Sequence, residues 1–202
     1  RAKFSKAWGV ETPETPGLMV TKMFPAVLEG KIKAMYIMGE NPVLSDADVT
    51  HVEEALEKLD FLVVQDIFMT ETAKFADVVL PATSYAERDG TYVNTERRVQ
   101  LTKPVVAPPG SARRDLEIIC DIAAAIGYPM TYESTSDVND EMRSLTPSYT
   151  GISHARLEAG EQLHWPCLSD DHPGTPILHS EKFARGLGLF HPIEFIAADE
   201  ET

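Results

Sequence analysis

The sequence of 202 residues predicts an α/β fold with an open, mostly parallel, doubly wound (Rossmann-like) sheet and a loop-rich C-terminal extension. Short apolar runs alternate with stretches of helical periodicity between residues 21 and 80, and the segments that join them are short. Strand, helix, strand in this order requires parallel pairing through right-handed crossovers. A hydrophobic content of 43% can form a real core.

The first half of the chain supplies the strands of the predicted sheet. Each is a short, continuous apolar run, which is the pattern of a strand buried on both faces. They are Ala34–Met38, Phe61–Val64 and Val78–Leu80. The predicted helices are a short one over 21–29 with Pro25 near its first turn, one capped by Ser45 or Asp46 that runs to Asp60, and a stretch around 70–75.

The second half begins with an excursion out of the sheet, in which two short strands flank the polar turn Asn94–Arg98. These strands are Thr91–Val93 and Val99–Thr102. Helical periodicity returns over 116–126, where we expect a helix that packs back on the sheet, and again over 137–145. We therefore expect an α/β domain over 1–146 and the loop-rich extension over 147–202.

Charge and cysteine content exclude several classes of protein. The formal net charge of −14 repels the phosphate backbone of nucleic acids. No apolar run approaches the ~20 residues needed to cross a bilayer, so we expect no membrane insertion. Cys120 and Cys167 lack metal-site spacing, and a reducing compartment, the cytoplasm, is expected. The start at Arg1, within amphipathic sequence, suggests a segment of a longer protein.

Polar residues follow each predicted strand of the sheet. The segments are Gly39–Pro42, Gln65–Asp66 and Pro81–Ser84. Ligands of open parallel sheets bind beyond the carboxyl ends of the strands, and acceptor side chains there suit a nucleotide. A carboxylate favours guanine, whose ring N–H and exocyclic amine are adjacent donors. The alternative is that these residues only form caps and turns.

Signals for other chemistry are weak. The sequence contains neither G-x-G-x-x-G nor a P-loop, its histidines lack metal spacing, and there is no G-x-S-x-G. Arginines are concentrated in one part of this acidic chain, and they either form a solvated surface or bind a pyrophosphate or a partner domain. They are Arg88, Arg97, Arg98, Arg113 and Arg114. We identify no catalytic residue, no metal ligand and no self-contained active site.

Four sequence runs, in this order, closely resemble the molybdopterin oxidoreductase family. They are MGENP (38–42), VVQDIFMTETAKFADVVLPATSYAE (63–87), GTYVNTERRVQ (90–100) and IGYPM (126–130). Within that family they look like the large (alpha) subunit of molybdenum- or tungsten-dependent formate dehydrogenases. The resemblance covers roughly residues 2–195, and its long second run is highly specific.

The resemblance implies a large subunit in which two molybdopterin guanine dinucleotides hold the metal. It also implies an iron–sulfur cluster and a Cys or selenocysteine metal ligand in N-terminal parts that this chain does not contain. The chain looks like the domain that holds one cofactor by its guanosine end and then leads toward a C-terminal β-domain. Its implied partners are the missing domains of the same subunit and electron-transfer subunits.

The resemblance also implies roles for particular residues. Ser45 would open a helix near the nucleotide, Asp115 would accept hydrogen bonds from guanine, and Ala82, where some relatives carry Ser, would contribute only its backbone. Asn94, Arg97 and Gln100 belong to a family motif and are expected to be structural or close to the cofactor. The implied cofactor-binding residues are Gly39, Glu40, Asn41, Ser45, Gln65, Asp66, Ala82 and Asp115.

The expected function is that of a cofactor-binding fragment. The intact enzyme would oxidise formate to carbon dioxide, or run the reverse, while this chain alone would turn over nothing. Two alternatives remain open: a non-catalytic assembly module of the same fold, and another branch of the family such as nitrate reductase or formylmethanofuran dehydrogenase.

Overall fold

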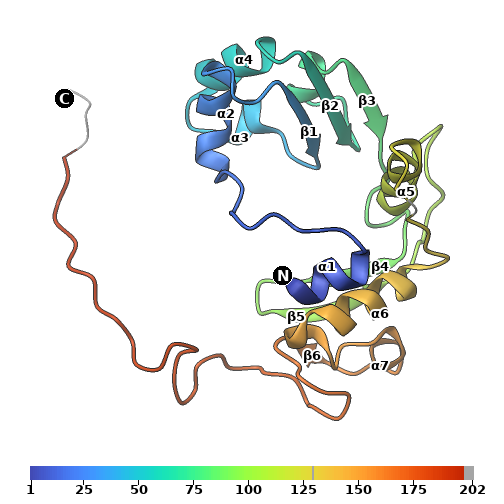
Figure 1. Cartoon of the computed structure of the whole chain (residues 1–202). Coiled ribbons are helices and arrows are strands. Elements are labelled where there is room, and N and C mark those ends of the chain that lie inside the picture. The colour runs from blue at the N-terminus through green and yellow to red at the C-terminus, as the bar shows by residue number, and fades with distance from the viewer. Residues whose placement is uncertain (129, 198–202) are drawn as a thin grey trace.

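The computed structural model describes residues 1–128 and 130–197. Figure 1 shows two sheets that lie apart, with helix α5 (Asp115–Ala125) beside the chain that passes from one to the other. Helix α1 (Ala2–Trp8) lies with the second sheet, and residues 9–19 cross from it to the first. Pro129 of the 126–130 run and residues 198–202 of the predicted extension lie outside the described residues.

The first sheet is parallel and has the order β1-β2-β3. Its strands are β1 (Ala34–Met38), β2 (Phe61–Asp66) and β3 (Val78–Pro81). The predicted open α/β sheet is thus confirmed. Strand β2 is longer than expected because Gln65 pairs with Met38 and Leu80, and Asp66 pairs with Pro81. Both polar residues therefore end the strand instead of forming a loop.

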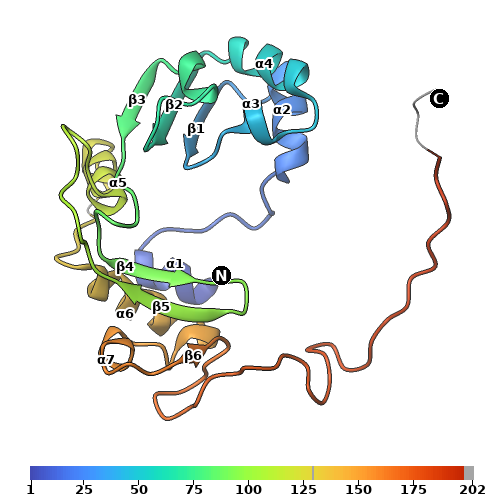
Figure 2. The same ribbon diagram turned by 180° about the vertical axis from the view of Figure 1, so that it is seen from behind.

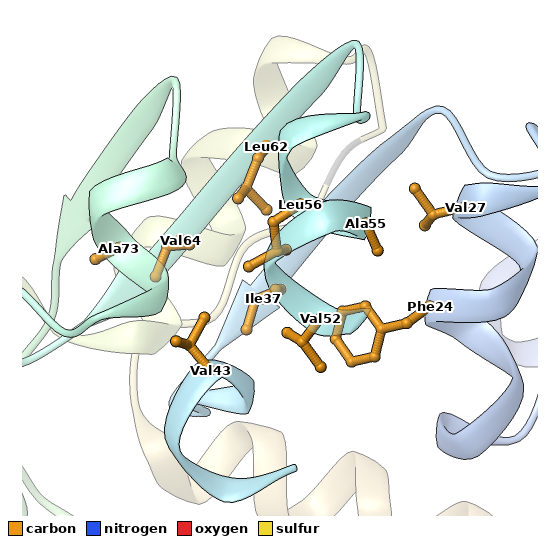
Figure 3. Packing of buried hydrophobic residues seen from close by; sticks show 10 residues of the cluster. All are labelled: Phe24, Val27, Ile37, Val43, Val52, Ala55, Leu56, Leu62, Val64 and Ala73. Carbon is orange, nitrogen blue, oxygen red and sulfur yellow. The ribbon is translucent and has the colours of Figure 1, made fainter. Parts of the chain in front are cut away.

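A hydrophobic core lies between this sheet and the helices packed on it (Figure 3). These helices are α2 (Val20–Leu28), α3 (Pro42–Ser45), α4 (Val49–Glu57) and the 3₁₀ helix η1 (Thr72–Phe75). Val52 of α4 and Val64 of β2 are both 0% exposed, and Phe24 of α2 is buried in the same cluster. The apolar face of α4 therefore anchors the crossover from β1 to β2.

The prediction that the strands are buried on both faces is wrong for β1 and β2. Alternate residues point to opposite faces, and Ile37, Leu62 and Val64 face the helices. On the opposite face Tyr36 remains 44% exposed and Phe61 45% exposed. Continuous apolar sequence indicates cover on both sides, but α2 and α4 pack on one side in the described part of the chain.

Two helix boundaries also differ from expectation. Ser45 and Asp46 do not begin the helix that leads to β2; Ser45 ends α3, and Asp48 caps α4 by accepting from the backbone N–H of His51 at 3.1 Å. The reason is Pro42, which suits the first turn of a helix and starts a separate short one. Pro25 stands inside α2 and not in its first turn.

The predicted excursion forms a second, antiparallel sheet of order β4-β5-β6. Its strands are β4 (Gly90–Val93), β5 (Arg98–Thr102) and β6 (Leu163–His164). Helix α6 (Thr135–Leu145) begins with a capping box between Ser134 and Asp137. It starts two residues before the predicted helix because Ser134 takes the cap position.

The region after residue 147 contains short elements that the sequence pattern did not reveal. They are the 3₁₀ helix η2 (Pro147–Tyr149), α7 (His154–Glu158) and β6, each too short for a detectable period. Ile152 and Cys167 are 0% exposed and pack with Val99 in a second core. By contrast, residues 187–197 extend away from both sheets, and Phe190 is 98% exposed (Figure 2).

Candidate functional site

The carboxyl ends of β1, β2 and β3 meet at one edge of the parallel sheet, and backbone hydrogen bonds tie this edge together. The N–H of Gly39 donates to the carbonyl of Gln65 at 2.9 Å, and that of Ala82 donates to Asp66 at 3.0 Å. Ala82 also forms a parallel bridge with Arg113, which brings the start of α5 to the same edge. The residues expected from separate loops therefore share one rim.

A side-chain network built on the buried Gln65 lies at the centre of this rim. Gln65 is 0% exposed, and its Nε2 donates to Oδ1 of Asp115 at 2.6 Å. The hydroxyl of Tyr36 donates to Oε1 of Gln65, and Arg88 forms an ion pair with Oδ2 of Asp115. Asp115 is the first residue of α5, where the helix dipole favours a negative charge.

The chemistry of the network fixes which groups donate. Partial burial of its hydroxyl, and secondarily the negative charge of Asp115, raise the pKa of Tyr36. Its phenol therefore stays protonated and acts as a donor, so Gln65 must present its carbonyl to Tyr36 and its amino group to Asp115. The carboxylate is the acceptor at the end of this chain of hydrogen bonds.

The side chain of Asn41, expected to contact the nucleotide, makes hydrogen bonds to Thr72 and Glu71. Its Oδ1 accepts from the backbone N–H of Thr72 at 3.1 Å and from the Thr72 hydroxyl at 2.7 Å. Its Nδ2 donates to Glu71 at 2.8 Å, which lowers the pKa of that carboxyl. The hydroxyl of Thr72, which is fully buried, accepts in turn from the N–H of Val43. Asn41 thus connects the segment after β1 to η1.

Asp66 shapes the segment after β2, and the two residues that follow it line a cavity. Its Oδ1 accepts from the N–H groups of Ile67 at 2.7 Å and of Phe68 at 3.2 Å, which forms a local turn. A cavity of about 340 Å³ adjoins this turn. That volume falls within the range of about 300–1,000 Å³ typical of small-molecule sites. The lining residues include Ile67, Phe68, Pro81, Ala82, Ser84 and Glu87.

Direct hydrogen bonds bring together five of the residues expected at the site: Gly39, Gln65, Asp66, Ala82 and Asp115. Gly39 has a φ of 65°, a conformation that favours glycine, which lets the chain turn sharply after β1. Glu40 and Ser45 are exposed. Among the described residues, neither side chain makes a hydrogen bond to the rest of this set.

The arginines expected as a basic concentration are engaged within the chain. Arg113 pairs with Asp121 at 2.7 Å, and Arg114 pairs with Glu117 at 2.6 Å and with Asp89 at 3.3 Å. The remaining ones bind acceptors elsewhere: Arg88 binds Asp115, Arg98 binds Glu96 and Gln162, and Arg97 binds the backbone carbonyls of residues 165, 175 and 176. Arg97 and Asn94 thus have structural contacts.

Sequence reasoning missed Tyr36 as a partner of the site, and it considered Arg88 for a solvated surface, a pyrophosphate or a partner domain but not for a contact with Asp115. A signal for Tyr36 was present, because it stands two residues before Met38, which pairs with Gln65 in the parallel register. Residues two apart in a strand share a face, so Tyr36 reaches Gln65 from the neighbouring strand. Arg88 gave no comparable signal, since it lies in a loop.

Within residues 1–128 and 130–197 no group of three or more His, Cys, Asp or Glu side chains is placed to hold a metal ion. No helix in the same part has the length and apolar character that a membrane crossing requires.

Comparison with known proteins gives relatives that are several times longer than this chain. The F420-dependent formate dehydrogenase subunit alpha of Methanocaldococcus jannaschii is 50% identical over 95% of this chain and 29% of its own length. Formate dehydrogenase H of Escherichia coli is 39% identical over 98% of this chain and 28% of its own length. The assimilatory nitrate reductase catalytic subunit of Bacillus subtilis is 41% identical, over 91% and 27%.

A solved structure and a family model extend the comparison. Acetylene hydratase from Pelobacter acetylenicus matches with a TM-score of 0.58 and 23% identity over 82% of this chain and 23% of that one, which supports the fold. The family model described as molybdopterin oxidoreductase matches residues 5–125, more than half of the chain and all of the parallel sheet. The chain therefore belongs to the molybdopterin oxidoreductase family.

Proposed function

We propose that this chain holds the guanosine end of a molybdopterin guanine dinucleotide in the alpha subunit of a formate dehydrogenase. The reaction of that enzyme is the two-electron oxidation of formate to carbon dioxide or its reverse. Relatives named as formate dehydrogenases support the assignment, and each of them extends well beyond the length of this chain. The chain by itself would then be inactive, as a part of the larger subunit.

The observation that carries the proposal is that the Asp115 carboxylate has unfilled hydrogen-bond acceptor positions among the described residues. Each carboxylate oxygen can accept two hydrogen bonds. Oδ1 accepts one from Gln65 and Oδ2 accepts one from Arg88, so one position on each oxygen remains among the described residues. Guanine presents two adjacent donors, its ring N–H and its exocyclic amine, and these match the two remaining positions. The acceptor positions at the rim therefore fit the purine of this cofactor.

The chemical roles divide between the cofactor and the protein. The pterin and its molybdenum or tungsten ion supply the redox chemistry when bound. Asp115 recognises the base, while Asp66 shapes the turn after β2 and Ala82 lines the cavity that adjoins this turn. The metal ligand and the iron–sulfur cluster belong to parts of the subunit outside this chain, and electron-transfer subunits and those parts are its partners. We place the enzyme in the cytoplasm.

A thermal-shift titration tests the nucleotide site. GDP or GMP should raise the melting temperature of the chain and ADP should not, since a ligand at 100 times its Kd stabilises the folded state by about 2.7 kcal/mol. Asp115→Ala should abolish the difference between guanine and adenine nucleotides. Asp121→Ala is the matched control, because it removes another carboxylate of α5 that pairs with Arg113. Equal shifts with ADP, or unchanged selectivity in Asp115→Ala, would contradict the proposal.

The nitrate reductase relative favours a second candidate, in which the same nucleotide site serves another substrate. Assays of the full-length subunit with formate and with nitrate separate the two. A third reading, a non-catalytic assembly module, predicts that neither guanine nor adenine nucleotides stabilise the chain.

A further inference from the structure

We infer that Tyr36, Gln65 and Arg88 are positioning residues that hold the Asp115 carboxylate in one orientation and thereby set its preference for purines carrying both a ring N–H and an exocyclic amine. The inference rests on the proposed nucleotide site. It assigns roles to two side chains, Tyr36 and Arg88, that lie outside the set expected to touch the nucleotide.

Tyr36 determines which end of the Gln65 amide faces Asp115. The Tyr36 hydroxyl donates to Oε1 of Gln65, which leaves Nε2 to donate to Asp115 at 2.6 Å. Without this hydroxyl the amide is free to turn over and place its oxygen against the carboxylate, where two acceptors repel each other. Gln65 is 0% exposed, so in the native chain the orientation of its amide depends on these two partners.

Arg88 holds the second oxygen of the Asp115 carboxylate. Its side chain is 31% exposed and that of Asp115 is 20% exposed, so the ion pair is largely shielded from solvent. The Arg88 guanidinium also lies over the ring of Tyr92, 5.7 Å from its centroid, which restricts its position. The adjacent residues form the reciprocal pair, in which Arg114 binds Asp89. Two crossed ion pairs thus fasten the start of α5 to the segment before β4.

A fixed carboxylate discriminates between purines by the number of donors they present. Guanine offers two adjacent donors, hypoxanthine offers only its ring N–H, and adenine places an acceptor next to its amine. If the carboxylate is free to rotate, the second donor of guanine gains little over the single donor of hypoxanthine. The ratio of the affinities for GMP and IMP therefore reports on the orientation of Asp115, independently of overall stability.

The test measures the Kd of GMP and of IMP by calorimetry for the native chain and for Tyr36→Phe. The native chain should bind GMP roughly tenfold more tightly than IMP, as expected for one hydrogen bond to a charged group. Tyr36→Phe should reduce this ratio to less than about threefold, and its far-UV circular dichroism should match the native spectrum. Tyr85→Phe is the matched control, because Tyr85 is 68% exposed and packs edge-on against Tyr92 outside the network.

Variants of Arg88 provide an independent test of the positioning roles, which remains available if Tyr36→Phe does not fold. Arg88→Gln should lower the GMP to IMP ratio, and Arg88→Lys, which keeps the charge, should restore part of it. Native ratios in Tyr36→Phe, or in Arg88→Gln, would overturn the positioning roles. If Asp115→Ala binds GMP with the native ratio, the proposed nucleotide site itself fails. The two failures are therefore distinguishable.

Discussion

Leu62 and Phe61 are neighbours in β2 and provide a sharp test of which face of the parallel sheet is buried. Leu62 is 1% exposed in the core under the helices, whereas Phe61 is 45% exposed on the opposite face. Leu62→Ala removes three carbon groups at ~0.8 kcal/mol each, or about 2.4 kcal/mol of burial. The cavity left behind should raise the cost in the free energy of unfolding to about 3–5 kcal/mol.

Phe61→Ala deletes a larger side chain and yet should cost only about 1–1.5 kcal/mol, because roughly half of that side chain stays in water. Urea unfolding followed by far-UV circular dichroism measures both variants under the same conditions. For a chain of this size, Leu62→Ala should lower the melting temperature by roughly 10 °C. A loss in Phe61→Ala equal to or above that in Leu62→Ala would refute the assignment of the buried face.

Two further predictions concern Asn41 and Tyr132. Asn41→Ala leaves the buried Thr72 without its main acceptor and should lower the free energy of unfolding by about 1–3 kcal/mol, whereas Glu71→Ala, which leaves both Thr72 contacts of Asn41 in place, should cost less in the same urea assay. A loss in Asn41→Ala below that of Glu71→Ala would argue against the contact. Burial, and then hydrogen bonding to Glu141, raise the pKa of Tyr132 to about 12. Because the folded pKa exceeds the unfolded value of about 10, this stabilisation should be complete below that pH and disappear as the pH rises toward 12. The pKa values of Tyr36 and Tyr149 are raised as well, so ultraviolet difference spectra should show a late-ionising component that Tyr132→Phe reduces and does not abolish; a native spectrum in that variant would contradict the assignment.

The parallel sheet was predictable because the local sequence pattern indicates each of its strands. Apolar runs of three to five residues separated by helical periodicity leave parallel pairing as the simple arrangement. Exposure was not predictable in the same way. Tyr36 and Phe61 belong to apolar runs, yet their exposure depends on what packs against the sheet, and that is a property of distant segments.

The second sheet shows where local pattern is insufficient. Strand β6 consists of Leu163–His164 alone, and it exists because it pairs with Arg98 and Val99 far away in the sequence. A strand of this length has no period to detect. Likewise, Arg97 holds the backbone carbonyls of residues 175 and 176, a contact across some 78 positions of sequence. Long-range contacts of this kind, and not a local sequence period, hold the region after residue 147 in its fold.

The candidate site illustrates why residue type alone does not decide between a structural and a ligand-binding role. Asn41 and Asp115 both stand at the carboxyl edge of the sheet and both suit a nucleotide. The Oδ1 of Asn41 already accepts two hydrogen bonds from Thr72, so its acceptor capacity is filled. Asp115 accepts one hydrogen bond on each oxygen among the described residues and retains room for two more. The number of unfilled acceptor positions therefore ranks Asp115 above Asn41 as a group that can recognise a base. The sequence could not give this ranking, because the hydrogen-bond partners of both residues come from distant parts of the chain.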